Sequence, residues 1–364
     1  MSFQATYSLV IRPLHFASFR WGGSFTPLVT GPAAIAFSEP LPMPSTIAGL
    51  LAGEAVGYKP SQGRVPPEEL EKLIAEKLGF GDKFALRGPY IYDEDTETVY
   101  LHYWDRSPTR GRLVAVELVE GELGISFQNV DYHQHTGIAL NNTCKSVIRG
   151  LIYTQMLAKQ DKPIIVEVYG AAKTWPNEKI VRKLGGEGRI AVIEKTNIAP
   201  LYKLATSIKA KNSWYAYVAT PILLPPHSTK DLARILEEKD RVIEVGEPPN
   251  TRIAIPTLKE LEDLIEVREK QRDSHSTRRR EDTREKLAKT AKRFRAKIAL
   301  LSPGYDMAAN MPRPLHPAIM PGSIVKIETT LNPQQLYQEG IGLHRKLGWG
   351  TLLPLPEKLV VKQQ

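Results

Sequence analysis

The alternation of apolar and polar residues predicts two successive series of β-strands. Residues 3–16, FQATYSLVIRPLHF, alternate and are rich in β-branched and aromatic side chains, as strands are. The runs TVYLHYW, LVAVELV and IIVEVYG follow between residues 84 and 170, separated by Gly, Pro and Asp. The run WYAYVATPILL at residues 214–224 begins a second series, which continues near residues 298–302 and 323–328.

Apolar residues at helical spacing predict helices between these strands. In residues 40–57, PLPMPSTIAGLLAGEAVG, Ser45 or Thr46 can cap a helix whose larger apolar residues lie on one side. Its remaining positions are mostly Ala and Gly, so other segments can pack closely against it. Residues 66–81 begin with prolines and acids and end at Gly79, which also indicates a helix. Further helices are predicted at residues 229–239, at 257–268 and at the end of 268–297.

The order of strands, helices and strands occurs twice, which predicts an α+β fold in two domains. A chain of 364 residues is long for a single core, which supports the division. We expect the domains to be residues 1–207 and 208–364, with a charged insertion in the second at about 257–297.

Composition limits the classes of protein that the chain can represent. Hydrophobic residues make up 42% and charged residues 24%, as in globular proteins. A single cysteine, Cys144, excludes both an internal disulfide and a cysteine-based zinc cluster. The N-terminus lacks the features of a signal peptide, and no apolar run is long enough to span a membrane. We therefore expect a cytoplasmic protein without a membrane partner.

Positive charge is concentrated in one stretch. The formal net charge is +9, and residues 268–295 carry 12 Lys/Arg against 5 Asp/Glu, or 12 − 5 = +7. Two interpretations remain open, because charge runs are often merely solvated. The stretch is either a solvated hairpin that binds nothing or an arm that contacts RNA.

Three glycine-rich basic loops are candidates for binding a polyanion. GIGLHRKLGWG at residues 340–350 lacks the glycine spacing of a dinucleotide fingerprint and the Gly-Lys-Ser/Thr of a phosphate loop. Its glycines would let another chain approach, and its basic residues would supply charge. RKLGGEGR at residues 182–189 and FRWGGSF at residues 19–25 have similar features. A turn with exposed basic residues is the alternative for each loop.

The segment DYHQHTG, residues 131–137, is the strongest enzyme-like feature. In an extended segment Asp131, His133 and His135 point to one side, where they could hold a metal or provide a general base. A structural or RNA-contacting role is favoured, because such a short motif occurs often by chance. No complete catalytic set is found, so we expect neither an enzyme nor a bound cofactor or metal.

The ordered motifs resemble the RAMP superfamily of CRISPR proteins, most closely the family of third subunits of the Cmr, or type III-B, effector complex. They span nearly the whole chain. In chain order the matching pieces are IRPL, SFRWGGSF, PMPSTIAGLLAG, HTGIALNNTCKSVIRGLIYT, LGGEGR, MPGSIVKIE and GIGLHRKLGWG. The chain departs from the family where RWGG lacks the acidic residue that often follows the arginine, and in the charged insertion.

This resemblance implies tandem ferredoxin-like, RRM-like βαββαβ domains. It also implies a non-catalytic subunit that binds the repeat-derived 5′ tag of CRISPR RNA (crRNA). Its protein partners would be the large polymerase-like subunit and neighbouring RAMP subunits. The implied RNA-binding residues are Arg20, Ser45, Thr46, Gly185, Gly186, Arg189, Gly342, His344, Arg345 and Lys346.

Other functions stay open within the same superfamily. Some RAMP proteins are metal-independent endoribonucleases that cut CRISPR repeats, in which case His133, His135 or His15 would act as general acid or base. The chain could also serve a Csm-type complex or bind only protein partners.

We predict that the double substitution Arg345→Ala with Lys346→Ala weakens retention of guide RNA without unfolding the protein. Each phosphate that the variant no longer neutralises lowers the log–log salt slope of binding by roughly one unit or less. Unchanged affinity and salt slope would remove this loop from the RNA site.

Overall fold

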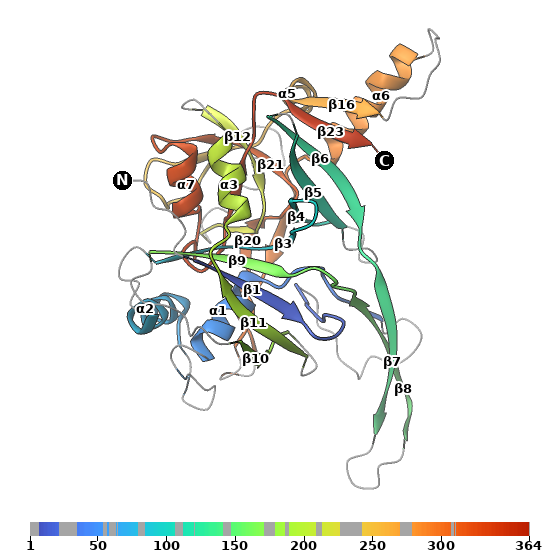
Figure 1. The fold of residues 1–364 in the computed structure, drawn as a ribbon, viewed down its shortest axis with the longest axis vertical. Helices are drawn as coiled ribbons and strands as arrows, with labels where there is room; N and C mark the ends of the chain where they lie inside the picture. The colour runs from blue at the N-terminus through green and yellow to red at the C-terminus, as the bar shows by residue number, and fades with distance from the viewer. Residues whose placement is uncertain are drawn as a thin grey trace.

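The computed structural model shows an α+β protein that is dominated by sheets (Figure 1). The predicted α+β class is therefore confirmed. Six helices lie within the described residues: α1 (Pro44–Leu51), α2 (Pro67–Leu78), α3 (Pro200–Ser207), α5 (Leu258–Leu264), α6 (Arg279–Arg293) and α7 (Pro333–Glu339). The structure describes residues 7–21, 35–53, 57, 63, 65–78, 84–105, 112–119, 121–140, 147–170, 179–185, 189–208, 213–225, 242–269, 279–306, 309 and 311–363.

The largest sheet in the described part of the chain has ten strands. Two of its strands, β23 and β16, come from the second half of the sequence and pair in parallel, whereas most of the others pair antiparallel. The sheet therefore contains residues from both sides of position 207. Its order is β10 (Ile180–Lys183), β11 (Ile190–Thr196), β1 (Tyr7–Pro13), β9 (Ile164–Tyr169), β3 (Ala85–Asp93), β4 (Thr98–Tyr103), β5 (Arg112–Val119), β6 (Glu122–Asn129), β23 (Leu359–Gln363) and β16 (Ile265–Glu269).

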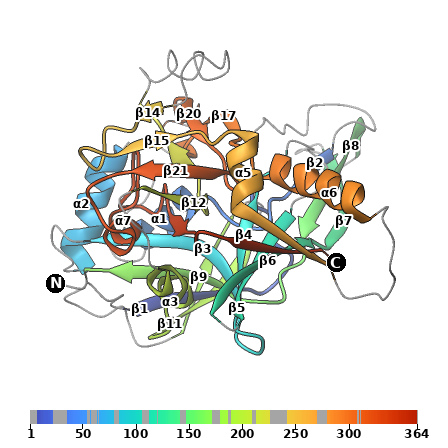
Figure 2. The ribbon, with the colours of Figure 1, turned by 90° about the horizontal axis from the view of Figure 1, so that it is seen from above.

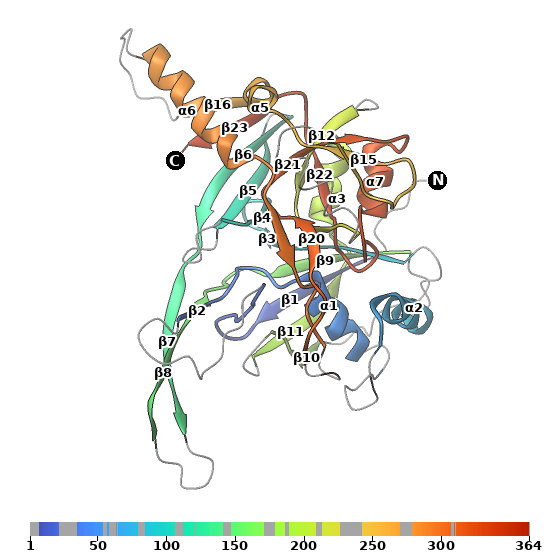
Figure 3. The ribbon, with the colours of Figure 1, turned by 180° about the vertical axis from the view of Figure 1, so that it is seen from behind.

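Smaller sheets complete the fold (Figures 1 and 3). The first is β14 (Val242–Glu244), β15 (Arg252–Ala254), β21 (Ile324–Glu328), β12 (Ser213–Val218) and β22 (Leu352–Pro354). The second is β13 (Ile222–Leu223), β20 (His316–Ile319) and β17 (Ile298–Leu301). A third joins β2 (Ile35–Phe37) to the long hairpin β7 (Tyr132–Leu140) and β8 (Val147–Ala158), and β18 (Tyr305–Asp306) pairs with β19 (Met311–Pro312).

The helices gather at separate places around these sheets. Figures 1 and 3 show α1 and α2 near β1 and β11, and α3 beside α7. Viewed from above, α5 and α6 lie together at the other end of the molecule (Figure 2). The hairpin β7–β8 projects from the body, as does α6 (Figure 1).

Three details differ from the sequence-based expectations. Neither Ser45 nor Thr46 caps α1, because the N-cap is the extended Met43 and Pro44 occupies the first turn. The helix expected at 257–268 ends at Leu264, since Ile265–Glu269 is drawn into the parallel pair with β23. The expected helix at residues 229–239 lies outside the described residues.

Buried Glu167 links strands and helices from both halves of the chain. Its side chain is fully buried and accepts hydrogen bonds from the hydroxyls of Tyr90 and Tyr169, each at 2.6 Å. The Tyr337 hydroxyl on α7 donates at 2.8 Å, and the Tyr202 backbone N–H on α3 donates at 3.0 Å. Burial raises the pKa of Glu167, and these four donors oppose that shift by stabilising the carboxylate.

Arg87 is a second fully buried charge, and it lies opposite Glu167 in the β3–β9 pairing. Its guanidinium donates to backbone carbonyls, including those of Tyr337 and Gln338 at the end of α7. It also donates to the carbonyl of Arg345 at 2.8 Å. Burial lowers the pKa of Arg87 to about 10, so the group stays charged at neutral pH. The pair of strands thus fixes both α7 and the loop that follows it.

We predict that Tyr337→Phe lowers the free energy of unfolding by roughly 1–3 kcal/mol, because a buried carboxylate loses one of its donors. Chemical denaturation of the full chain measures this. Tyr215→Phe is the matched control, since Tyr215 is half-buried and its hydroxyl makes no hydrogen bond to the described residues. Equal effects of the two substitutions would show that the Glu167 cluster contributes little.

Candidate nucleic-acid interface

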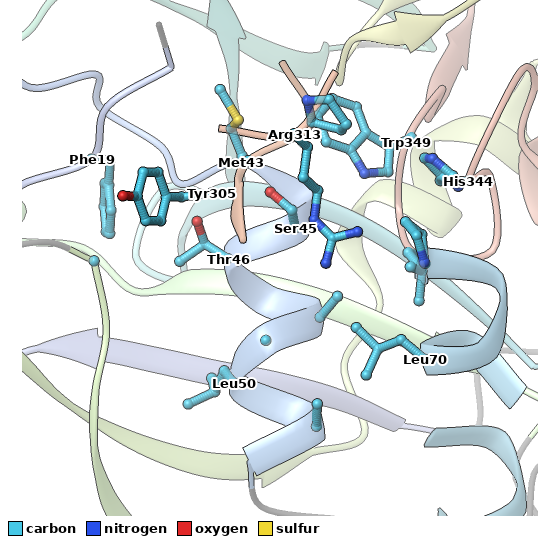
Figure 4. A pocket seen from close by; sticks show the side chains of 18 of the residues that line it. Phe19, Met43, Ser45, Thr46, Leu50, Leu70, Tyr305, Arg313, His344 and Trp349 are labelled. Carbon is cyan, nitrogen blue, oxygen red and sulfur yellow. The ribbon is translucent and has the colours of Figure 1, made fainter. Parts of the chain in front are cut away.

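A cleft of about 580 Å³ lies between α1, α2 and four other segments. Its walls come from positions far apart in the sequence, and Figure 4 shows their side chains around α1. Three cations line it, and none of its lining residues within the described chain is Asp or Glu. The lining segments besides the two helices are residues 18–20, 183–185, 303–305 with 313, and 344–349.

The composition of α1 explains why this helix forms one wall of the cleft. Its larger apolar residues, such as Ile47 and Leu51, are buried against the sheet. On the cleft side, Gly49 is exposed and a Cβ added there would meet no atom within 4 Å. Ser45 and Thr46 are half-buried and face the same space, where their hydroxyls can bond to a ligand (Figure 4).

Two glycines let the other walls approach. Gly185 has a φ of +80°, and a Cβ there would lie 2.7 Å from the carbonyl oxygen of Ser18. Gly304 has a φ of +124°, and a Cβ would lie 2.8 Å from the hydroxyl of Ser45. A side chain at either position would therefore strain the backbone and push the walls of the cleft apart.

The cleft has a positive electrostatic character. Arg20 and Lys183 are exposed at its edge. Arg313 is half-buried, and its guanidinium donates weakly to the Val65 carbonyl at 3.4 Å. Burial lowers the pKa of His344, so this ring is neutral at pH 7 and offers a hydrogen bond rather than a charge.

Five of the predicted RNA-binding residues converge in this cleft. The structure places Arg189, Gly342, Arg345 and Lys346 outside its lining, and Gly186 lies outside the described residues. The residues that line it are Arg20, Ser45, Thr46, Gly185 and His344.

The glycine-rich loop at residues 340–350 packs against other parts of the same chain, which the sequence did not indicate. A Cβ on Gly350 would lie 1.8 Å from the carbonyl oxygen of Ile341, and one on Gly342 would lie 2.5 Å from that of Leu223. The backbone N–H groups of Gly342, Leu343 and Gly350 donate to carbonyls of the same protein. These groups therefore do not form an open cradle for a phosphate.

The charged side chains of the loop also have partners within the chain. Arg345 pairs with Glu247 at 3.0 Å and with Glu339. Lys346 lies 3.3 Å from Glu71. An RNA phosphate would have to compete with these carboxylates, so binding by Arg345 and Lys346 stays a prediction.

The histidines of residues 131–137 lie on the hairpin β7–β8 and not in the cleft. The ring of His133 stacks on Phe16 with centroids 4.3 Å apart, and His135 is exposed. Within the described residues, no three His, Cys, Asp or Glu side chains are placed to hold a metal ion. The structure does not assemble the metal site that Asp131, His133 and His135 could have formed.

Comparison with known proteins gives one sequence match and several structural ones. No protein-family model matches the chain. The CRISPR system CMR subunit Cmr3 of Saccharolobus solfataricus is 28% identical over 240 residues, which cover 62% of this chain and 72% of that protein. The chain is similar to Cmr3. The resemblance predicted from its ordered motifs to a Cmr-type CRISPR protein is thereby confirmed.

Solved structures extend the likeness to the fold. A chain of the type III-B Cmr-β complex bound to cognate target RNA and AMPPnP superposes with a TM-score of 0.51 at 17% identity. That alignment covers 88% of this chain and 86% of the other. A chain of the same complex bound to cognate target RNA has a TM-score of 0.49, with the same identity and coverage.

Several cleft residues, among them Phe19, Tyr305 and Arg313, were not among the predicted RNA-binding residues. Phe19 stands beside a predicted arginine, so its position in the FRWGG motif was a usable signal. Tyr305 and Arg313 reach the cleft only because β18 and the segment after β19 fold over α1, which no local pattern indicates. Separately, no described helix has the length and apolar character needed to cross a membrane.

We predict that Gly342→Ala destabilises the protein by about 1–3 kcal/mol, because its positive φ and the close Leu223 carbonyl leave no room for a Cβ. Gly49→Ala is the control: it adds the same methyl group in open space on a helix, where alanine is favoured. Thermal and chemical unfolding of both variants compare them. A Gly342→Ala protein as stable as the control would contradict the role assigned to this glycine.

Proposed function

We propose that this chain is a non-catalytic RNA-binding subunit of a type III-B Cmr effector complex, working in the cytoplasm. In this proposal its cleft holds the repeat-derived 5′ tag of crRNA. The observation that carries the proposal is the convergence of Arg20, Lys183 and Arg313 in a cleft without a lining carboxylate among its described residues. Cations gathered on one surface attract phosphates.

The lining of the cleft suits a single RNA strand. Arg20 and Lys183 would neutralise phosphates, and the hydroxyls of Ser45 and Thr46 would bond to phosphate or sugar oxygens. Figure 4 shows the rings of Phe19 and Tyr305 at the same end of the cleft. Tyr305 is 50% exposed and offers a face on which an unpaired base can stack.

The remaining parts of the proposal rest on the likeness to Cmr3. We propose that the chain docks on the large polymerase-like subunit and contacts neighbouring RAMP subunits. We also propose that residues 1–207 and 208–364 are tandem ferredoxin-like domains, although β16 and β23 extend the first sheet. The other predicted RNA contacts, Arg189 and the loop of Arg345 and Lys346, would act beside the cleft.

The endoribonuclease alternative draws less support from the geometry. The histidines to which it assigns general acid or base catalysis, His133, His135 and His15, do not line the cleft. The face of His133 is covered by Phe16. Repeat RNA incubated with the protein and a chelator would be cleaved only under the alternative, with loss of cleavage in His133→Ala or His135→Ala.

We predict that Arg20→Gln with Lys183→Gln weakens binding of RNA carrying the repeat-derived 5′ tag. For a single strand, the log–log salt slope should fall by about 0.7 for each phosphate that is no longer neutralised. Fluorescence anisotropy at several salt concentrations measures both quantities. Lys72→Gln with Lys77→Gln on α2 is the control, since both lysines are exposed and outside the cleft. Equal behaviour of the two variants would overturn the proposed site.

A further inference from the structure

Helix α6 has one side fixed to the protein and one side covered with cations. Its apolar side includes Thr290, Ala291 and Phe294, which are at most 3% exposed, and Leu287 packs against the same core. The helix that was predicted at the end of residues 268–297 is therefore present, and it is followed by strand β17, which begins at Ile298. The helix is therefore held as part of the folded body.

An aromatic cluster anchors the end of the helix. The ring of Phe294 lies 5.4 Å from that of Phe127 and 6.5 Å from that of Tyr103. The Tyr103 hydroxyl donates to the carbonyl of Arg293 at 2.9 Å, and the Arg293 guanidinium lies over the Phe127 ring. From this anchor the helix projects outward along its length, as Figures 1 and 3 show.

The outer surface of α6 and of the turn after it carries four exposed cations. Arg284, Lys289, Lys292 and Arg295 are exposed, and none forms an ion pair with a described residue. Elsewhere many surface cations do have such partners, as in Arg12 with Glu194 and Lys362 with Glu117. We call the four residues the α6 basic face.

Helix stability accounts for only part of this charge. Cations near a helix C-terminus interact favourably with the helix dipole, and this explains a lysine at position 292 by helix stability alone. The effect decays within the last turn, so it does not explain Arg284. The sequence of α6 holds three acids, Glu281, Asp282 and Glu285, against seven Lys and Arg residues, which leaves an excess of positive charge.

The side chains of the α6 basic face indicate which kind of partner it binds. None of the large apolar side chains that the described structure exposes belongs to α6. Protein interfaces usually need apolar or aromatic anchors, whereas contact with a nucleic-acid backbone needs only cations that reach phosphates. Without an exposed ring, the face also has nothing on which a base can stack.

We propose that the α6 basic face binds the phosphate backbone of RNA as a second, sequence-independent contact, separate from the cleft. That the polyanion is RNA rests on the proposed function of the cleft. That the α6 basic face binds a polyanion rests only on its own exposed cations. In Figures 1 and 3 the helix lies at the end of the molecule away from α1. An RNA strand that leaves the cleft could therefore be held at two places on one subunit.

The test uses the full-length protein and single-stranded RNA of random sequence, so that no tag is required. The variant replaces Arg284, Lys289, Lys292 and Arg295 with Gln. We expect weaker binding and a log–log salt slope lower by about 2 to 3, because three or four phosphates are no longer neutralised. The control replaces Lys72, Lys77, Lys203 and Arg252, four exposed cations outside both surfaces, with Gln. Circular dichroism and thermal unfolding confirm that both variants fold.

The outcomes separate this proposal from the proposed function. An α6 variant with the wild-type slope, or a control with the same decrease, would overturn the proposal. So would wild-type protein without measurable binding to random RNA. Retained RNA binding with loss of a co-purifying protein partner would show a protein interface instead. Loss of tag preference in the cleft variant Arg20→Gln with Lys183→Gln reports on the cleft alone.

Discussion

The carboxylate of Glu167 and the guanidinium of Arg87 are buried opposite each other on neighbouring strands, and much of the fold is arranged around them. Placing a charge in a protein interior costs several kcal/mol unless donors or acceptors replace its water. Here the replacements come from β3, β9, α3 and α7 for the anion, and from the end of α7 and the last loop for the cation. Neither charge is satisfied unless both halves of the chain are in place. The two charges therefore favour one relative placement of the two halves.

This constraint extends to the cleft. Arg87 holds the carbonyl of Arg345, and the backbone N–H of Leu86 donates to the carbonyl of Lys346 at 2.9 Å. The next residues of the loop, Leu347 and Trp349, line the cleft against α1. The interior pair of charges thus positions one wall of the surface that we assign to RNA. A loop that looks like a binding motif in sequence owes its glycines to this internal packing.

The spacing of apolar residues was sufficient to predict the strands and helices that bury one face. The strands at Tyr7–Pro13 and Ser213–Val218 and the helix at Pro67–Leu78 were predictable for this reason. Ile265–Glu269 was not, since its extended form depends on pairing with β23. The same limit applies to the cleft: basic and glycine-rich loops identified Arg20 and Gly185, but not the acids that neutralise Arg345. Ion pairs such as Arg345 with Glu247 join residues far apart in sequence, and the local spacing of residues gives no sign of them.

The parallel insertion of β23 between β6 and β16 has a consequence for synthesis of the protein on the ribosome. The strand β6 is made early, whereas its neighbour β23 follows the whole second series of strands. Until β23 emerges, the hydrogen-bonding edge of β6 has no partner from this sheet, and β16 has no strand through which to join it. Unpaired strand edges promote association between chains. Completion of the large sheet is thus a late event in synthesis, and the edge of β6 stays open to pairing with another chain until β23 has been made.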